Sequence, residues 1–229
     1  MSSRIDSNAR VLRAFAPHDL TSSLAYVIGF RDWAYRKRAV DALRLAKGDR
    51  VVEIGCGTGR NFALLERAVG PGGAVIAVDA SEAMLARARR RVASHGWLNV
   101  ELVQSDAASY EFPAAVDGVL STYTLVILPE YDRVIERACR ALKEGKRCVV
   151  LDQKLPSGPA SRLVPLVDVL SRPLDYSGIV GERKLWESIQ RHAGNVQVEE
   201  RYFGFVYLAV GEKCATGARP RYSGAVKTP

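Results

Sequence analysis

A strand that runs directly into a glycine-rich loop and then a helix constrains this 229-residue chain more than any other feature. Residues 51–54 have strand character, glycines follow at Gly55, Gly57 and Gly59, and helical spacing begins at residue 61. Because glycine has no Cβ, such a loop can turn sharply and approach a ligand closely. The start of the helix adds unpaired N–H groups and a partial positive charge. The segment therefore predicts a ligand-binding strand–loop–helix unit.

Two further predicted strands end in polar or acidic residues. Residues 73–78 lead to Asp79, and residues 100–104 lead to Ser105 and Asp106. The carboxyl ends of parallel strands meet at one edge of a sheet, and open α/β sheets bind their ligands there. The glycines are one residue too closely spaced for the G-x-G-x-x-G fingerprint of dinucleotide-binding proteins, which argues against an NAD-dependent oxidoreductase.

The order of these motifs resembles the class I S-adenosylmethionine-dependent methyltransferases. The matching residues are Glu53-x-Gly55-x-Gly57-x-Gly59, then Val78-Asp79-x-Ser81, then Asp106-Ala107. The resemblance implies an enzyme with a Rossmann-like α/β fold, in which a doubly wound, mostly parallel seven-stranded sheet ends in a C-terminal antiparallel hairpin. It also implies S-adenosyl-L-methionine as the cofactor.

The resemblance implies roles for individual residues as well. The glycine loop is expected beside the methionine part of the cofactor, Asp79 on the ribose hydroxyls, and Asp106 on the adenine amino group. Met84, one turn into the helix after Asp79, is either an apolar wall for adenine or an ordinary core residue. The full set expected to bind the cofactor is Glu53, Gly55, Gly57, Gly59, Asp79, Ser81, Met84, Asp106 and Ala107.

The rest of the chain fits the same architecture. A helix is expected up to about Leu45, and from residue 51 onward strands and helices alternate, which is typical of a parallel doubly wound sheet. Later elements are expected as strands at residues 118–121 and 147–151, a helix at 131–142, and a hairpin of strands at 196–202 and 205–210.

These elements divide the chain into three parts. Residues 1–30 are expected to form a helical lid that can also contact a membrane, and residues 31–213 the methyltransferase domain. Within that domain, residues 156–186 form an apolar, proline-interrupted insertion that should lie over the carboxyl edge of the sheet and cover the substrate pocket. Residues 214–229 are polar, contain Gly and Pro, and are expected to be a loose tail.

Composition and charge limit where such a chain can act. Hydrophobic content of 48% and charged content of 25% are those of a soluble globular protein, and four cysteines without metal-ligand spacing suit a reducing cytoplasm and predict no metal site. The sequence therefore predicts a cytoplasmic protein without a secretory signal or membrane span. The net charge of +8 leaves nucleic acid, an anionic membrane surface or neither as partners.

Residues beyond the cofactor motifs narrow the choice of methyl acceptor. Ser121-Thr122-Tyr123-Thr124 stands where the methyltransferases of exocyclic base amines have Asn/Asp-Pro-Pro-Tyr/Phe, so nucleic acid is disfavoured. Residues 33–40, 55–62, 96–100 and 202–207 are similar to the bacterial phosphatidylethanolamine and betaine-lipid N-methyltransferases, close relatives of the ubiquinone/menaquinone C-methyltransferases.

That resemblance favours N-methylation of a phospholipid headgroup amine, carried out peripherally at the inner face of an anionic membrane that basic residues such as Arg36, Lys37 and Arg38 would contact. The alternatives are C- or O-methylation of a quinone or other small molecule, and a non-catalytic cofactor-binding module. The sequence leaves the oligomeric state open.

Methyl transfer needs few catalytic groups, since the cofactor carries the reactive methyl and the protein aligns it. Tyr123 is the first candidate because the residue after the fourth strand faces the transferred methyl in this fold. His18 and Asp152 are candidate proton acceptors, although His18 also fits a surface loop and Asp152 also fits a helix cap or a partner of Lys154. Tyr26 and Tyr176 are further substrate-side candidates.

Overall fold

The computed structural model describes residues 32–156, 158–165, 180–181 and 183–214 of the chain. Several predictions fall outside these ranges: the lid at residues 1–30, most of the insertion and of the C-terminal tail, and the candidates His18, Tyr26 and Tyr176. None of the described helices is long and apolar enough to span a membrane.

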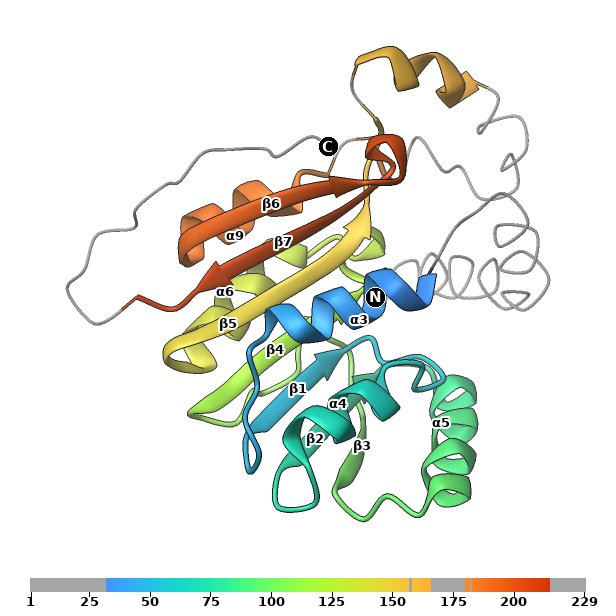
Figure 1. The fold of residues 1–229 in the computed structure, drawn as a ribbon, viewed down its shortest axis with the longest axis vertical. Coiled ribbons are helices and arrows are strands. Elements are labelled where there is room, and N and C mark those ends of the chain that lie inside the picture. The colour runs from blue at the N-terminus through green and yellow to red at the C-terminus, as the bar shows by residue number, and fades with distance from the viewer. Residues whose placement is uncertain (1–31, 157, 166–179, 182, 215–229) are drawn as a thin grey trace.

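Seven strands form one sheet in the order β3-β2-β1-β4-β5-β7-β6 (Figure 1). Neighbours among β1 to β5 pair in parallel, whereas β7 runs antiparallel to both β5 and β6. The strands are β1 (Arg50–Ile54), β2 (Ala74–Asp79), β3 (Val100–Gln104), β4 (Val116–Thr122), β5 (Leu142–Gln153), β6 (Gly194–Arg201) and β7 (Val206–Glu212). The predicted fold class is confirmed, including the C-terminal antiparallel hairpin.

Helices cover both faces of this sheet. Alternate residues of a strand point to opposite faces, so strands made of consecutive apolar residues give both faces an apolar surface that helices can cover. Val51 and Val75 pack on one face with α3 and α4, and Val52 and Ile76 pack on the other with α6. Figure 1 shows α3 and α4 in front of the sheet and α6 and α9 behind it. The helices are α3 (Asp32–Ala42), α4 (Phe62–Val69), α5 (Glu82–His95), α6 (Tyr131–Ala141) and α9 (Leu185–His192), with short 3-10 turns η1 (Leu125–Ile127), η2 (Gly158–Leu163) and η4 (Tyr202–Gly204).

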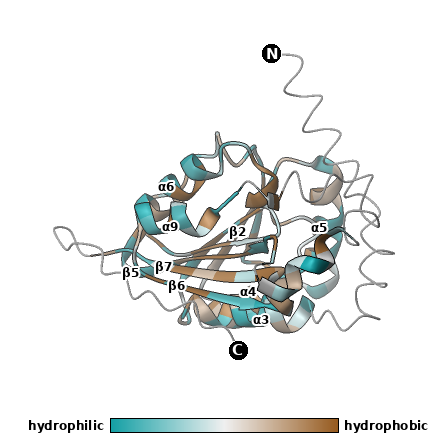
Figure 2. Cartoon of the chain, turned by 90° about the horizontal axis from the view of Figure 1, so that it is seen from above, coloured by the Kyte–Doolittle hydropathy of each residue, from teal (hydrophilic) through white to brown (hydrophobic). Residues whose placement is uncertain are grey.

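The distribution of apolar residues agrees with this layering. In Figure 2 much of the sheet is hydrophobic, whereas the outer surfaces of α6 and α9 are largely hydrophilic. Every residue of β4 is buried, as expected for a central strand covered on both faces.

Several element ends differ from the sequence-based expectation, most clearly those of α3 and β5. α3 ends at Ala42 rather than near Leu45, because Arg44 has a left-handed φ of 54° that a helix cannot contain. β5 extends beyond residues 147–151 at both ends, because Leu142 pairs with Val116 of β4 and Gln153 pairs with Val206 of β7. By contrast, β3 has the bounds that its sequence pattern predicts.

Candidate cofactor and acceptor site

The glycine loop between β1 and α4 is anchored to the neighbouring strand. The backbone N–H groups of Gly55 and Cys56 both donate to the Val78 carbonyl of β2, at 2.8 and 3.0 Å. A Cβ at position 59 would overlap the Phe62 ring, whereas a Cβ at Gly57 would meet no atom within 4 Å. Gly59 is therefore required for packing within the protein. Gly57 leaves a backbone surface open, which is what close approach of a ligand requires.

Asp79 joins this loop to the end of β2. One carboxylate oxygen accepts the Gly57 N–H at 2.8 Å, and the other accepts the Ser81 N–H at 2.9 Å. A carboxylate has about four acceptor positions, so capacity for two further hydrogen bonds remains. The Ser81 hydroxyl accepts the Met84 N–H at 3.4 Å and caps α5, which gives Ser81 a structural role.

Asp106 lies at the end of the neighbouring strand. Asp79 pairs with Gln104 across β2 and β3, and the Ser105 N–H donates to the Asp79 carbonyl at 3.1 Å. One carboxylate oxygen of Asp106 accepts the Ala108 N–H at 2.9 Å, and the side chain is exposed. The structure thus places the two acidic residues on adjacent strand ends. Met84 is half-buried in the first turn of α5, and Ala107 is buried.

Glu53 is fully buried under the glycine loop. Its Oε1 accepts a hydrogen bond from the Asn61 side chain at 2.5 Å, while its Oε2 has no hydrogen-bond partner among the residues that the structure describes. Burial raises the pKa of Glu53 to about 7, an effect that the Asn61 hydrogen bond and the Arg36 charge oppose. A buried carboxylate oxygen without a donor is costly, so this one fits a positively charged or N–H-bearing group of a ligand.

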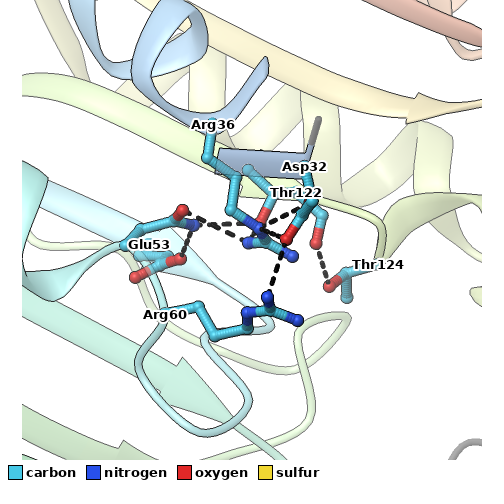
Figure 3. Close-up of polar contacts among 7 residues, drawn as sticks. Asp32, Arg36, Glu53, Arg60, Thr122 and Thr124 are labelled. Carbon is cyan, nitrogen blue, oxygen red and sulfur yellow. Dashed lines mark hydrogen bonds and ion pairs between the residues drawn. The ribbon is translucent and has the colours of Figure 1, made fainter. Parts of the chain in front are cut away.

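Arg36 of α3 is the hub of a polar network beside Glu53 that the sequence did not predict as part of the site (Figure 3). Its Nε donates to the Asp32 carboxylate at 2.9 Å, and its Nη1 donates to both the Asn61 Oδ1 at 3.2 Å and the Thr122 Oγ1 at 2.9 Å. Arg60 from the glycine loop binds the same Asp32 at 3.1 Å. In the sequence, the spacing of Asp32 and Arg36, one helical turn apart before the first strand, is the feature that indicates an ion pair at this position.

This network changes the expectation for the basic stretch of α3. The Arg36 side chain is 12% exposed and lies over the Tyr123 ring, 5.0 Å from its centroid. Lys37 and Arg38 are more than half exposed and pair with Asp41 and Glu199. Of the three cations expected to contact lipid, Arg36 therefore belongs to the interior site.

Of the catalytic candidates, Tyr123 and Asp152 lie together at the carboxyl ends of β4 and β5. Tyr123 has a left-handed φ of 54°, and burial together with the Asp32 charge raises the pKa of its hydroxyl, which therefore stays protonated. Asp152 is fully buried, and its oxygens accept the N–H groups of Val126 and Gln153 at 3.0 and 2.9 Å. Asp152 is thus a cap for η1, one of its two expected structural alternatives; Lys154 instead pairs with Glu200.

Comparisons with known proteins agree with this geometry. Residues 51–145 match the family model described as a methyltransferase domain. Relatives named demethylmenaquinone methyltransferase include one from Shouchella clausii (strain KSM-K16), 30% identical over 146 residues, which are 63% of this chain and 61% of the relative. Another, from Anoxybacillus flavithermus (strain DSM 21510 / WK1), is 33% identical over 133 residues, 57% of this chain and 56% of the relative. The matches thus span about three fifths of the relatives' length.

Solved structures with the same fold are more distant in sequence. A SAM-dependent methyltransferase from Aquifex aeolicus has a TM-score of 0.55 at 22% identity, covering 78% of this chain and 89% of its own. Geranyl diphosphate C-methyltransferase from Streptomyces coelicolor A3(2), solved with S-adenosyl-L-homocysteine, has a TM-score of 0.64 at 16% identity and covers 80% of each chain. At these identities the likeness concerns the fold alone.

Proposed function

We propose that this chain, which contains a class I S-adenosylmethionine-dependent methyltransferase domain, methylates a ring carbon of a quinone-type acceptor in its reduced form. The observation that carries the cofactor half of the proposal is the buried, unpaired Oε2 of Glu53 beside a glycine loop and two strand-end carboxylates. The acceptor half rests on the relatives named demethylmenaquinone methyltransferase.

The residues present fit the cofactor of this family. The unpaired oxygen of Glu53 matches the ammonium group, the remaining acceptor positions of Asp79 match two ribose hydroxyls, and the second oxygen of Asp106 matches an adenine amino group. Gly57 has room for a ligand against its backbone. Bound S-adenosylmethionine would supply a methyl group on a sulfonium, a strong electrophile that needs alignment more than activation.

The protein's part in C-methylation is to hold the acceptor and exclude water. With the cofactor bound, the reduced ring would supply the electron pair for the new carbon–carbon bond, S-adenosylhomocysteine would be the leaving group, and the displaced ring hydrogen would be lost as a proton to solvent. Tyr123, whose hydroxyl stays protonated, is suited to donating a hydrogen bond to a ring oxygen. Residues 31–213 act as one domain in this proposal, with the insertion at 156–186 above the acceptor.

Phospholipid N-methylation, which the sequence favours, shares this cofactor site and differs only in the acceptor. The relatives favour the quinone alternative instead, so the experiment must offer both acceptors. Purified protein is incubated with tritium-labelled S-adenosylmethionine and either a short-chain demethylmenaquinol or vesicles of phosphatidylethanolamine with an anionic lipid. We expect label in the quinol product, and none with the Gly57→Val variant.

Label in phosphatidylethanolamine alone would contradict the quinone proposal and support the phospholipid one. Vesicle binding that falls as salt rises would further support a peripheral enzyme. Absence of transfer to either acceptor by protein that still binds S-adenosylhomocysteine would favour the non-catalytic module.

A further inference from the structure

Asp152 holds the segment that follows β4 rather than facing open space. It is 0% exposed, and its carboxylate accepts hydrogen bonds from the N–H groups of Val126 and Gln153. The backbone N–H groups of Leu125 and Thr124 also stabilise its charge. Burial raises the pKa of Asp152 to about 7, and these backbone hydrogen bonds oppose the rise. A carboxylate that is fully buried and holds a neighbouring segment is poorly placed to take a proton from a bound acceptor.

The segment that Asp152 holds is in contact with the glycine loop. The Thr124 hydroxyl donates to the Gly55 carbonyl at 3.2 Å, and the Thr124 side chain fills the space that a Cβ at Gly55 would need. Tyr123, the preceding residue, is the catalytic candidate and has a left-handed backbone. Any shift of residues 123–126 would therefore move both the Thr124 side chain that packs against the glycine loop and the Tyr123 hydroxyl that is the catalytic candidate.

Residues 123–126 are also held by a residue of the insertion. The guanidinium of Arg183, which belongs to the insertion after β5, donates to the Val126 carbonyl. Val126 is thus bound through its N–H by Asp152 and through its carbonyl by Arg183. This arrangement connects Arg183 to the glycine loop through Val126 and Thr124, whose hydroxyl contacts the Gly55 carbonyl.

We propose that Asp152 is a positioning residue that fixes residues 123–126 against the glycine loop, with Arg183 assisting from the insertion. That this position affects cofactor binding and the catalytic candidate Tyr123 rests on the proposed function. It replaces the expectation that Asp152 is a proton acceptor. An Asn side chain has the same shape but only one acceptor oxygen, so its NH₂ group would face a backbone N–H.

The test uses S-adenosylhomocysteine titrated calorimetrically into the parent, Asp152→Asn, Thr124→Ala and the double variant. We expect Asp152→Asn to weaken binding about tenfold although Asp152 is inaccessible to the ligand, and the double variant to be no weaker than Asp152→Asn alone. Asp117→Asn is the matched control, since Asp117 is a buried β4 carboxylate that accepts the Arg50 N–H at the opposite edge of the sheet. Its affinity should stay within about twofold of the parent.

Amide hydrogen exchange measured by NMR tests the same inference without any ligand. In Asp152→Asn the Val126 and Gln153 amides should exchange faster than in the parent, while the β2–β3 amides stay unchanged. If the parent fails to bind S-adenosylhomocysteine, the proposed function fails, and the exchange result still decides the anchoring. If Asp152→Asn does not fold, Arg183→Met should weaken binding and speed Val126 exchange in the same direction.

Additive effects of Asp152→Asn and Thr124→Ala on affinity would overturn the proposal, because residue 152 would then not act through the segment. Unchanged exchange at Val126 in both Asp152→Asn and Arg183→Met would overturn it as well.

Discussion

Replacing Glu53 by Gln gives the sharpest energetic prediction. Gln keeps the oxygen that accepts the Asn61 hydrogen bond and places an NH₂ group where the unpaired Oε2 lies. The substitution thus removes an ionisable group from a fully buried position with little change in shape. Its effect should be dominated by the cost of ionising Glu53 in the folded protein.

The magnitude follows from the pKa of Glu53, which burial raises from 4.5 to about 7. At 1.36 kcal/mol for each pKa unit, that difference corresponds to about 3 kcal/mol of folding free energy. Because the folded-state pKa is the higher one, the contribution of Glu53 to stability is fully present below pH 4.5 and is lost as the pH rises through about 7. The amide of the Glu53→Gln variant cannot ionise and loses nothing over this range.

Urea unfolding followed by circular dichroism, on the parent and on Glu53→Gln without ligand, measures this difference. The free energy of unfolding of the variant minus that of the parent should grow by about 3 kcal/mol between pH 4.5 and pH 8 and then stay level. Asp152 ionises in both proteins, so its contribution cancels. A difference that stays constant, or that shrinks with rising pH, would refute the placement of Glu53 as a buried, underpaired carboxylate.

Asp117→Asn is the control, because the pKa of Asp117 is shifted in the opposite direction from that of Glu53. Burial alone would raise the pKa of Asp117, but the Arg50 N–H and the nearby Lys143 and Lys146 outweigh it and leave the pKa lowered. Its contribution to stability is therefore present above pH 3.8 and is lost as the pH falls through the lower folded-state pKa. Between pH 5 and pH 8 the difference between this variant and the parent should not change.

Three further substitutions separate ligand binding from folding. Asp79→Ala should weaken S-adenosylhomocysteine binding measured by calorimetry by about 1.5–3 kcal/mol for each lost ribose hydrogen bond, and affinity equal to the parent's would exclude the assigned role. Gly57→Ala should lose about 1–2 kcal/mol of stability to its φ of 55° yet keep the fold, since its Cβ meets no neighbour, while ligand affinity falls. Gly59→Ala should instead lower the melting temperature strongly because its Cβ overlaps Phe62, and equal melting temperatures would contradict this distinction.

The strands and the acidic strand ends could be predicted because their signals are local. β3 has the predicted bounds, and Asp79 and Asp106 stand next to apolar runs that define their positions. The Arg36 network could not be predicted, because it joins Arg36 to Asn61 and Thr122, residues that only the folded sheet brings together. In the sequence, Arg36 is one basic residue among several in the same stretch.

The role of Asp152 illustrates the same limit at the acceptor side. Its position after a predicted strand fits a base, a helix cap or an ion pair equally well. The choice depends on the path of residues 124–126, which turn back toward the end of β5. Such a path is set by tertiary packing and by the left-handed Tyr123, and neither is visible in local sequence patterns.

The central claim is that the glycine loop and the strand-end acids form a site for an S-adenosyl cofactor. Calorimetric titration of the parent protein with S-adenosylhomocysteine, and separately with NAD, tests it most directly. We predict saturable binding of S-adenosylhomocysteine at one site per chain, lost in Gly57→Val, and no heat of binding with NAD. Saturable NAD binding, or S-adenosylhomocysteine binding that Gly57→Val leaves unchanged, would contradict the claim.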